Sequence, residues 1–224
     1  MAQPALNLLE VDFFSALPRP EAEELARHSE HRKYSDGNRV YSQGDRLPGV
    51  LIVVRGALKV FRTDGRGHIQ VLEFLRPGQC VGEVPVFDGA PIASSAEAHG
   101  ETELWLIPGA PLRDMAHRRP EVAEGLMRHF AAKVRHLVGL VEALSLHSVP
   151  ERVAQTILEY QAHHAERMVV EFEETQEELA QCVGASREAF SRALRLLSDL
   201  GLIHSTFPVV KVVDLAKLKR YAKG

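Results

Sequence analysis

Glycine is distributed unevenly along the 224 residues, and this distribution most limits how the first half of the chain can fold. Eleven of the sixteen glycines lie between Gly37 and Gly109, mostly five to twelve residues apart. Short runs rich in β-type residues lie between them, at positions 50–54, 57–61, 69–74 and 104–107. Short strands at regular spacing with turn signals are typical of sandwiches and barrels. We therefore expect a small antiparallel β-barrel over residues 30–108.

The apolar pattern becomes helical between Pro120 and Ser145, a stretch with no interior proline. Its apolar residues are spaced alternately by four and three, at Phe130, Val134, Leu137, Val141 and Leu144. This is the spacing of a and d positions in a coiled-coil seam. We interpret the stretch as a long helix that pairs with a second copy. The alternative is a single amphipathic helix packed on its own barrel.

Pro150 marks a boundary, because proline disfavours helical geometry at the residue before it. The expected domains are a sensor domain over residues 1–118, a dimerisation helix over 119–147 and a second domain over 148–224. Within that second domain we expect helices at 151–165, 175–183 and 187–200, strands at 168–172, 203–206 and 209–213, and then a basic tail.

The stretch from Thr175 to Leu197 carries the signals of two short helices joined by a tight turn. Thr175 and Glu178 form a capping-box pattern at the start of the first helix. Gly184 suits the left-handed residue that follows a helix, and Ser186 suits the next N-cap. Each helix has one apolar face, formed by Leu179, Ala180 and Val183 and then by Ala189, Phe190, Ala193, Leu194 and Leu197. This pattern predicts a helix-turn-helix; an unrelated αα-hairpin is the alternative.

The exposed face of the second helix is the predicted functional surface, since a recognition helix places its N-terminal residues against base edges in the major groove. The residues predicted to contact DNA are Thr175, Ser186, Arg187, Glu188, Ser191 and Arg192. Arginine pairs with guanine O6 and N7, and glutamate accepts from cytosine N4. Glu188 and Arg192 are also four residues apart, so a surface ion pair is a competing interpretation.

Charge along the chain supports a DNA-binding surface, although the net charge of the whole chain is −3. Residues 186–224 contain eight basic and three acidic residues, a net charge of +5. Residues 151–178 contain eight acidic and two basic residues, a net charge of −6. A basic face beside an acidic one is a footprint of nucleic-acid binding that the overall charge conceals.

The barrel, the seam helix and the C-terminal helix-turn-helix together resemble the Crp/Fnr family of bacterial transcription regulators. Segments 56–61 and 78–89 are similar to the family's cyclic-nucleotide-binding fold, and segment 184–192 is similar to its recognition helix. The resemblance implies an α+β fold with an N-terminal cyclic-nucleotide-binding-like β-barrel (a jelly roll), a long dimerisation helix and a C-terminal winged helix-turn-helix. It implies a homodimeric activator that binds a palindromic operator in double-stranded DNA and contacts RNA polymerase.

The resemblance leaves the operator half-site open. Arg187, Glu188 and Arg192 match the positions by which the catabolite activator branch reads DNA, which implies a TGTGA-like half-site. Glu188, Ser191 and Arg192 match the oxygen-sensing branch, which implies a TTGAT-like half-site. We also expect a cytoplasmic location without a membrane segment, because the longest apolar run, 50–54, is short and no secretory signal begins the chain.

The expected effector pocket contains Gly82, Glu83, Ile92, Ala93 and Ser94. By resemblance, cyclic-nucleotide binders carry Gly-Glu and, several residues later, Arg-Ser. Here Gly82 and Glu83 match, but Ile92 and Ala93 stand at the Arg-Ser positions. A buried phosphate without an arginine partner would be costly to desolvate. We therefore expect a signal other than cyclic AMP or cyclic GMP, or a regulator that needs no effector.

The two cysteines, Cys80 and Cys182, bear on the cofactor. None precedes Cys80, so the N-terminal cluster that holds iron–sulfur in the oxygen-sensing branch is missing. Segments 92–96, 144–146 and 189–192 are most similar to the nitrogen-oxide-responsive branch, the dissimilatory nitrate respiration regulators, whose members are thought to use haem. Haem therefore stays open, with histidines that bind no metal as the alternative; the candidate ligands are His28, His31, His68, His99, His129 and His136.

Two other classes of protein compete with a regulator. A metal-dependent barrel enzyme of the cupin type needs a His-x-His pair, whereas His68 and His99 stand alone in the sequence. The motifs GxxxxGK[ST], GxGxxG, HExxH and GxSxG are also absent. We expect no enzymatic activity and assign no metal ligands. A ligand-storage dimer whose helix-turn-helix serves only for packing is the third class.

Overall fold

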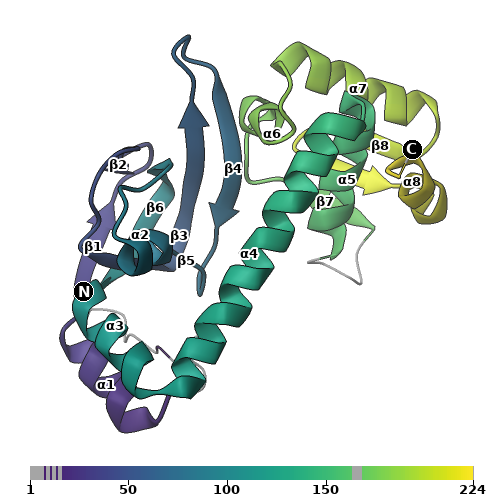
Figure 1. The fold of residues 1–224 in the computed structure, drawn as a ribbon. Coiled ribbons are helices and arrows are strands. Elements are labelled where there is room, and N and C mark those ends of the chain that lie inside the picture. Colours follow the sequence, from purple (N-terminus) through teal and green to yellow (C-terminus); the bar gives the residue numbers. More distant parts are fainter. Residues whose placement is uncertain (1–7, 9–10, 12–13, 15–16, 163–167, 224) are drawn as a thin grey trace. The chain divides into compact units, whose positions relative to one another are not determined.

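The computed structural model describes residues 8, 11, 14, 17–162 and 168–223 (Figure 1). The chain divides into two units, Met1–Arg135 and His136–Gly224. The division falls inside helix α4 (Pro120–Leu146), which is continuous across it and ends one residue beyond the expected helix. Among the described residues, no helix is long and apolar enough to cross a membrane.

The first unit is built on two long antiparallel strands, β3 (Gly49–Thr63) and β6 (Ser95–Pro108). Both pair with shorter strands to form one antiparallel sheet of six strands. The shorter strands are β1 (Glu30–Tyr34) and β2 (Arg39–Tyr41) on β6, and β4 (Ile69–Leu75) and β5 (Cys80–Val81) on β3. The expected α+β fold, an antiparallel β domain followed by helices and a helix-turn-helix, is confirmed.

Strand β3 joins two runs that the sequence suggested as separate strands, 50–54 and 57–61. Its pairing with β6 shifts register on both sides of Arg55. Gly56 has φ +72°, and a Cβ there would lie 2.5 Å from the carbonyl oxygen of Glu101. A bulge with a glycine bends a strand without ending it, so Gly56, which separates the two expected strands, is an irregularity within one strand.

Both faces of β3 are buried. Val50 and Ile52 pack in a core with helices α1 (Arg19–Arg27), α3 (Gly109–Arg118) and the start of α4. Leu51 and Val53 point the other way, into the interior of the β domain. A strand covered on both faces is continuously apolar, which explains the unbroken run 50–54. Neither α3 nor the short helix α2 (Glu83–Asp88) was expected from the sequence.

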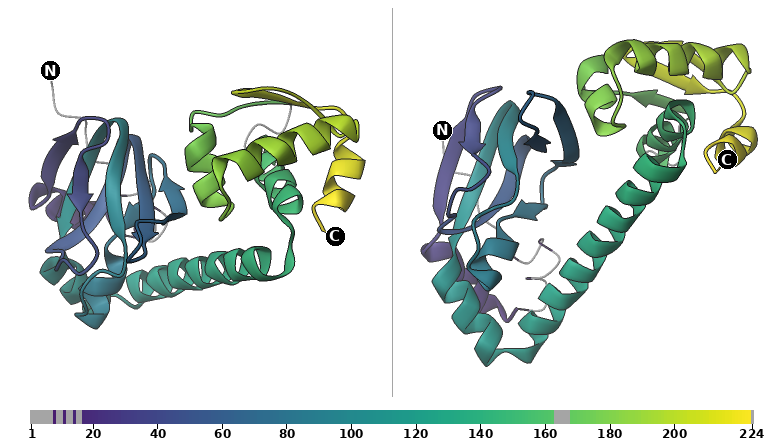
Figure 2. Two further views of the ribbon diagram at one scale, coloured as in Figure 1. Left: turned by 90° about the horizontal axis from the view of Figure 1, so that it is seen from above. Right: turned by 45° about the horizontal axis from the view of Figure 1, so that its top comes forward.

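The second unit contains a three-stranded antiparallel sheet in the order β7–β9–β8. Its elements are α5 (Val149–Ala162), β7 (Val169–Glu171), α6 (Gln176–Cys182), α7 (Arg187–Asp199), β8 (Ile203–Thr206), β9 (Val209–Val212) and α8 (Leu215–Tyr221). The helices pack around a core shared with these strands (Figure 2). Helix α8 occupies the segment expected to be a basic tail.

Pro150 lies within the first turn of α5, which begins two residues before the expected start. Proline is favoured in a first turn, where its missing N–H costs no hydrogen bond. The break between α4 and α5 therefore consists of His147 and Ser148 alone. Residues 163–165 of the expected helix lie outside the described residues.

Helices α6 and α7 form the helix-turn-helix, with the caps that the sequence predicted. Thr175 and Glu178 form both hydrogen bonds of a capping box at the start of α6. Gly184 follows α6 with φ +61°, and the Ser186 hydroxyl accepts from the backbone N–H of Ala189 at the start of α7. The turn is thus fixed by short-range hydrogen bonds and one left-handed glycine.

Arg152 of α5 also holds this turn in place, and the sequence analysis did not single it out. Its guanidinium donates to the carbonyl oxygens of Val183 (2.7 Å) and Gly184 (3.4 Å). It donates as well to the carbonyl oxygen of His147, at 2.6 Å. Charge-assisted hydrogen bonds of this kind are stronger than neutral ones. Arg152 therefore connects α5 to the end of α6 and to the break after α4.

Replacing Arg152 with alanine should destabilise the second unit, because three carbonyl oxygens lose a charged donor. We expect Arg152→Ala to lower the free energy of unfolding by about 1–3 kcal/mol. Urea denaturation followed by far-UV circular dichroism measures this change. Arg195→Ala removes an exposed arginine of α7 and should change it by less than about 0.5 kcal/mol. Equal losses in the two variants would contradict the role assigned to Arg152.

Candidate DNA-binding helix and effector pocket

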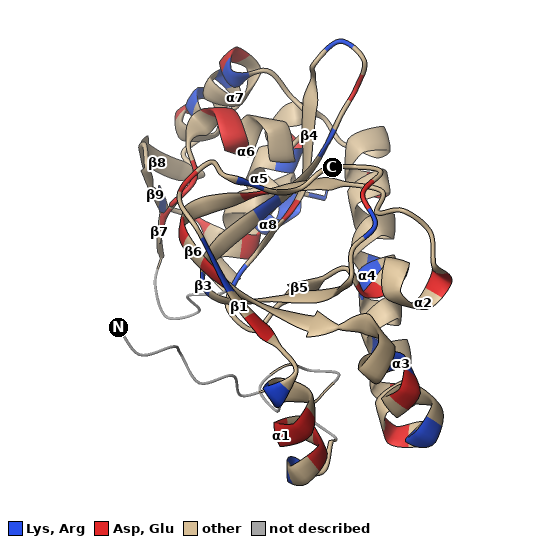
Figure 3. Ribbon diagram, turned by 90° about the vertical axis from the view of Figure 1, so that its left-hand side faces the viewer, with Lys and Arg blue, Asp and Glu red and all other residues tan. Residues whose placement is uncertain are grey.

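Helix α7 has a buried side and a polar, exposed side. Its buried residues are Phe190, Ala193, Leu194 and Leu197. Arg187, Glu188 and Arg192 are exposed, and Ser191 is half-buried. Residues four apart lie on the same face of a helix, so Glu188 and Arg192 are neighbours. Figure 3 shows basic and acidic positions close together along α7.

Two of the residues expected to contact DNA, Thr175 and Ser186, have hydroxyls engaged in helix caps. Thr175 Oγ1 accepts from the Glu178 backbone N–H (3.2 Å) and donates to the Glu178 carboxylate (3.0 Å). Ser186 Oγ accepts from the backbone N–H of Ala189, at 3.2 Å. Both residues are exposed at the start of a helix. Their hydroxyls set the starts of α6 and α7, and the charged groups of this surface come from Arg187, Glu188 and Arg192.

The carboxylate of Glu188 is held in its ionised form. A hydrogen bond from its own backbone N–H, another from the Ser186 hydroxyl and the positive charges of Arg192 and Arg187 lower the pKa of Glu188 below its ordinary value. An ionised carboxylate is a hydrogen-bond acceptor only. Glu188 therefore presents an acceptor beside two guanidinium donors at the beginning of α7.

The predicted seam on α4 is partly exposed. The exposed fractions are 59% for Val134, 49% for Leu137, 64% for Val141 and 36% for Leu144. Phe130 differs, because it is half-buried against the core formed by α1, α3 and one face of the sheet, with its ring 6.2 Å from that of Phe87. The start of the seam thus packs on the chain's own first unit, and the rest is apolar surface in the single chain.

The expected effector pocket begins at a tight backbone turn. Gly82 has φ +97°, and a Cβ there would lie 2.8 Å from the carbonyl oxygen of Gly49. Only glycine fits such a position without strain. The turn leads directly into α2, whose first residue, Glu83, is 2% exposed. The backbone geometry thus places a carboxylate inside the first unit.

Helix α4 supplies the side-chain partners of Glu83. Glu83 Oε1 lies 3.0 Å from His129 Nε2 and 3.5 Å from Lys133 Nζ. Lys133 Nζ also lies 2.9 Å from a carboxylate oxygen of Glu73 on β4. Burial raises the pKa of Glu83, but the His129 hydrogen bond and the Lys133 charge outweigh burial, and the pKa lies below its ordinary value. Glu83 is therefore a buried, ionised carboxylate.

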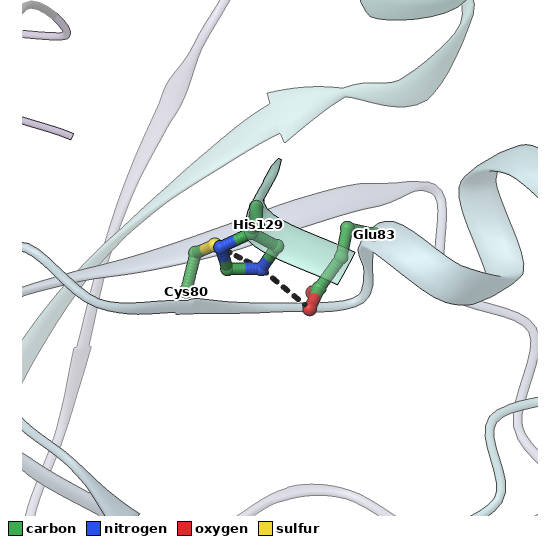
Figure 4. A group of neighbouring side chains, drawn as sticks. All are labelled: Cys80, Glu83 and His129. Carbon is green, nitrogen blue, oxygen red and sulfur yellow. Dashed lines mark hydrogen bonds and ion pairs between the residues drawn. The ribbon is translucent and has the colours of Figure 1, made fainter. Parts of the chain in front are cut away.

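Cys80 of β5 completes a cluster with these residues (Figure 4). Its Sγ lies 3.9 Å from His129 Nε2. One donor atom from each of Cys80, Glu83 and His129 lies within 4.8 Å of the other two, and this is the one such group of potential metal ligands among the described residues. Cys80 and His129 are 49 residues apart, so no local sequence pattern connects them.

The other part of the expected pocket is apolar. Ile92 is 5% exposed and packs in the interior of the β domain, together with Leu58 and Val60. Its backbone N–H donates to Asp45 O, and its carbonyl accepts from the Gly44 N–H, both at 2.9 Å. Ser94 is buried and Ala93 is exposed. Ile92 therefore brings a branched, uncharged hydrocarbon side chain to this part of the domain.

The remaining candidate histidines have other surroundings. His28 bonds to a backbone carbonyl, His31 pairs with Glu103, His68 pairs with Asp64, His99 packs against Phe74, and His136 is exposed on α4. Within the parts of the chain that the structure describes, His129 is the histidine that lies with a thiol and a carboxylate. It is therefore the candidate best placed to bind a metal.

Comparison with known proteins agrees with this architecture. The model of the cyclic nucleotide-binding domain matches residues 31–119, and that of the Crp-like helix-turn-helix domain matches residues 151–221. A CRP-like cAMP-activated global transcriptional regulator of Mycobacterium tuberculosis is 30% identical over 191 residues, which cover 84% of this chain and 85% of that protein. A cyclic AMP receptor protein of Thermus thermophilus is 30% identical over 206 residues, covering 92% and 94%.

Solved structures show the same fold. A CooA mutant from Carboxydothermus hydrogenoformans has a TM-score of 0.79 at 16% identity, and the match covers 97% of this chain and 96% of that one. FixK2 from Bradyrhizobium japonicum has a TM-score of 0.77 at 22% identity, with 86% and 96% covered. With both domain models in the expected order and relatives over most of its length, the chain belongs to the Crp/Fnr family of DNA-binding transcription regulators.

Proposed function

We propose that this chain is a homodimeric activator that reads a palindromic operator through α7 and responds to a signal other than a cyclic nucleotide. The observation that carries the proposal is the exposed N-terminal face of α7, where Arg187, Glu188 and Arg192 stand beside one another on a helix-turn-helix. Base readout needs donors and acceptors on a helix that enters the major groove. This face supplies both.

The chemistry of the three side chains predicts their roles on DNA. Arg192 can donate two hydrogen bonds to guanine O6 and N7, and ionised Glu188 can accept from cytosine N4. Their proximity also orients the guanidinium, so the surface pairing expected from their spacing and base readout are compatible. The other basic residues between 186 and 224 supply attraction to phosphates that does not depend on sequence.

The apolar surface of α4 supports the dimer. Val134, Leu137 and Val141 follow the seam spacing and are about half exposed or more in the single chain. A second copy of the helix would remove this surface from water, at roughly 25 cal/mol per Å² of apolar area. In such a dimer the two recognition helices lie about 34–36 Å apart, in successive major grooves of a palindrome.

Ile92 supports a signal other than a cyclic nucleotide. The names of the two relatives from Mycobacterium tuberculosis and Thermus thermophilus refer to cyclic AMP. In this chain a buried, uncharged side chain stands where cyclic-nucleotide binders carry arginine. A phosphate placed there would lose its hydration without gaining a charged partner. We therefore expect this chain to share the fold of these relatives and to respond to a different effector.

The activator role rests on the resemblance and on the acidic segment 151–178. That segment carries a net charge of −6 beside the basic recognition region, so it repels DNA and suits a protein partner. We propose RNA polymerase as that partner. Residues 163–167 of this segment lie outside the described residues.

Loss of the Arg192 side chain should weaken operator binding and relax specificity at one base pair. We expect Arg192→Ala to lower operator affinity by about 1–3 kcal/mol, roughly 5- to 150-fold. Fluorescence anisotropy with operators that vary at each position measures both effects at fixed salt. Arg118→Ala, an exposed arginine of α3, is the control and should bind like the unaltered protein. Unchanged affinity and base preference in Arg192→Ala would refute the assignment.

Charged residues in the seam should separate the copies. Leu137→Glu places one charged residue on each helix of the dimer. Each substitution removes a leucine whose burial in the seam would stabilise the dimer by roughly 1.5–3 kcal/mol. We expect the dimer dissociation constant to rise at least about 100-fold, as measured by analytical ultracentrifugation. Arg135→Glu changes an exposed residue outside the seam. It should change the dimer dissociation constant by less than about 5-fold. A protein that is monomeric before any substitution would contradict the proposed dimer.

Cyclic nucleotides should neither bind to this chain nor increase its affinity for the operator. We expect isothermal titration calorimetry with cyclic AMP or cyclic GMP to give no heat of binding at millimolar ligand, and operator affinity to change less than about 2-fold. The Mycobacterium tuberculosis relative serves as the positive control, because its name records activation by cAMP. Micromolar binding by this chain would show that the pocket accommodates the phosphate without the expected arginine.

A further inference from the structure

We propose that Cys80, Glu83 and His129 bind a divalent transition-metal ion, and that this ion is Zn²⁺. The three side chains come from β5, α2 and α4, and their donor atoms lie within 4.8 Å of one another. All three residues belong to the first unit. Glu83 is also a residue of the expected effector pocket, whereas the DNA-binding proposal does not depend on this site.

The set of ligands selects the class of metal. A thiolate and an imidazole favour Zn²⁺ and similar transition metals over Mg²⁺ and Ca²⁺, which prefer oxygen alone. One Cys, one His and one Glu make three protein ligands, the number found in zinc sites that keep a fourth position for water. The thiolate and the carboxylate together balance the two positive charges of the ion.

The distances permit a tetrahedral site after small movements. Around a tetrahedral Zn²⁺, the usual bond lengths place ligand atoms about 3.4–3.6 Å apart. His129 Nε2 is 3.0 Å from Glu83 Oε1 and 3.9 Å from Cys80 Sγ. The first of these distances involves Glu83 Oε1. Rotation of the Glu83 carboxylate, with small rotations of the Cys80 and His129 side chains, would place Oε2, Sγ and Nε2 around one ion. Figure 4 shows the three side chains converging on one region.

Glu83 gives a second, independent indication of a ligand. Its Oε2 is buried and has no hydrogen-bond partner among the described residues. A buried charged oxygen without a partner is costly. Both Glu83 contacts described above, with His129 and Lys133, are made by Oε1. Oε2 is therefore the oxygen that we assign to the metal.

Lys133 orients the carboxylate of Glu83 without binding the metal itself. Carboxylates that bind metals are usually oriented by hydrogen bonds from a second layer of residues. Lys133 Nζ lies 3.5 Å from Glu83 Oε1 and is held on its other side by Glu73, at 2.9 Å. Glu73 offsets the charge of Lys133, so the lysine can orient Glu83 without adding net positive charge beside the ion.

Metal binding is tested on the full-length chain after removal of any affinity tag and dialysis against a chelator. Zn²⁺ is added, and the bound metal is counted by inductively coupled plasma mass spectrometry. Co²⁺ serves as the spectroscopic probe, because a thiolate bound to it gives a charge-transfer band in the near ultraviolet. We expect one Zn²⁺ per chain and a cobalt spectrum typical of tetrahedral coordination with one sulfur ligand.

Single substitutions distinguish this site from adventitious binding. Cys80→Ser should abolish the charge-transfer band, and Glu83→Gln and His129→Gln should each weaken Zn²⁺ binding at least 10-fold. Cys182→Ser and His136→Gln are the matched controls, one for the thiol and one for an imidazole on the same helix. Far-UV circular dichroism checks that each variant folds.

Three results would overturn the proposal. The first is substoichiometric Zn²⁺ on the unaltered protein, and the second is a charge-transfer band that persists in Cys80→Ser. The third is a loss of Zn²⁺ binding in Cys182→Ser or His136→Gln that is as large as the loss in the cluster variants. The first would mean that the cluster is a hydrogen-bonded link between α2 and α4 and nothing more. The first result is obtained on unaltered protein and without DNA, so it remains decisive if a variant fails to fold and is independent of operator binding.

Discussion

The pairing of β3 with β6 is the constraint on which the rest of the first unit depends. Each of the two strands pairs with two shorter strands as well, and β3 is covered on both faces. One face closes the interior of the β domain. The other receives α1, α3 and the start of α4. β5 pairs with β3, and Cys80 packs in the core on that second face. The turn from β5 into α2 therefore lies against the first half of α4, where Glu83 contacts His129.

A buried carboxylate at this junction is expensive in free energy, and the protein compensates with a hydrogen bond from His129 and the positive charge of Lys133. His129 and Lys133 both approach Glu83 from α4, and Glu73 holds the lysine in position. The junction between sheet and long helix is thus electrostatic as well as apolar. Breaking one partner of such a network leaves an uncompensated charge in a region of low dielectric constant. The geometry of α4 relative to the sheet in this unit is therefore sensitive to whatever neutralises Glu83.

Sequence reasoning succeeded where the determinants are local. The caps at Thr175 and Ser186 and the left-handed glycine at 184 lie within a few residues of the atoms they bond. It failed where determinants are distant in sequence. Gly56 separates two runs that were expected to be different strands, because a glycine bulge within one paired strand and a turn between two strands have the same local signal. The role of Arg152 was not expected, because its acceptors at Val183 and Gly184 are 31 and 32 residues away in sequence.

The exposed seam of α4 also affects how the amount of active protein depends on its synthesis. If the DNA-binding form is the dimer proposed above, its concentration rises with the square of the chain concentration while most chains are monomers. The apolar residues Leu137 and Val141 then form the dimer contact, and its strength sets the number of chains per cell at which dimers begin to form. A twofold change in expression would give a larger change in operator occupancy near that threshold. The strength of one helix–helix interface would thereby decide how steeply the regulated genes respond to the regulator's own abundance.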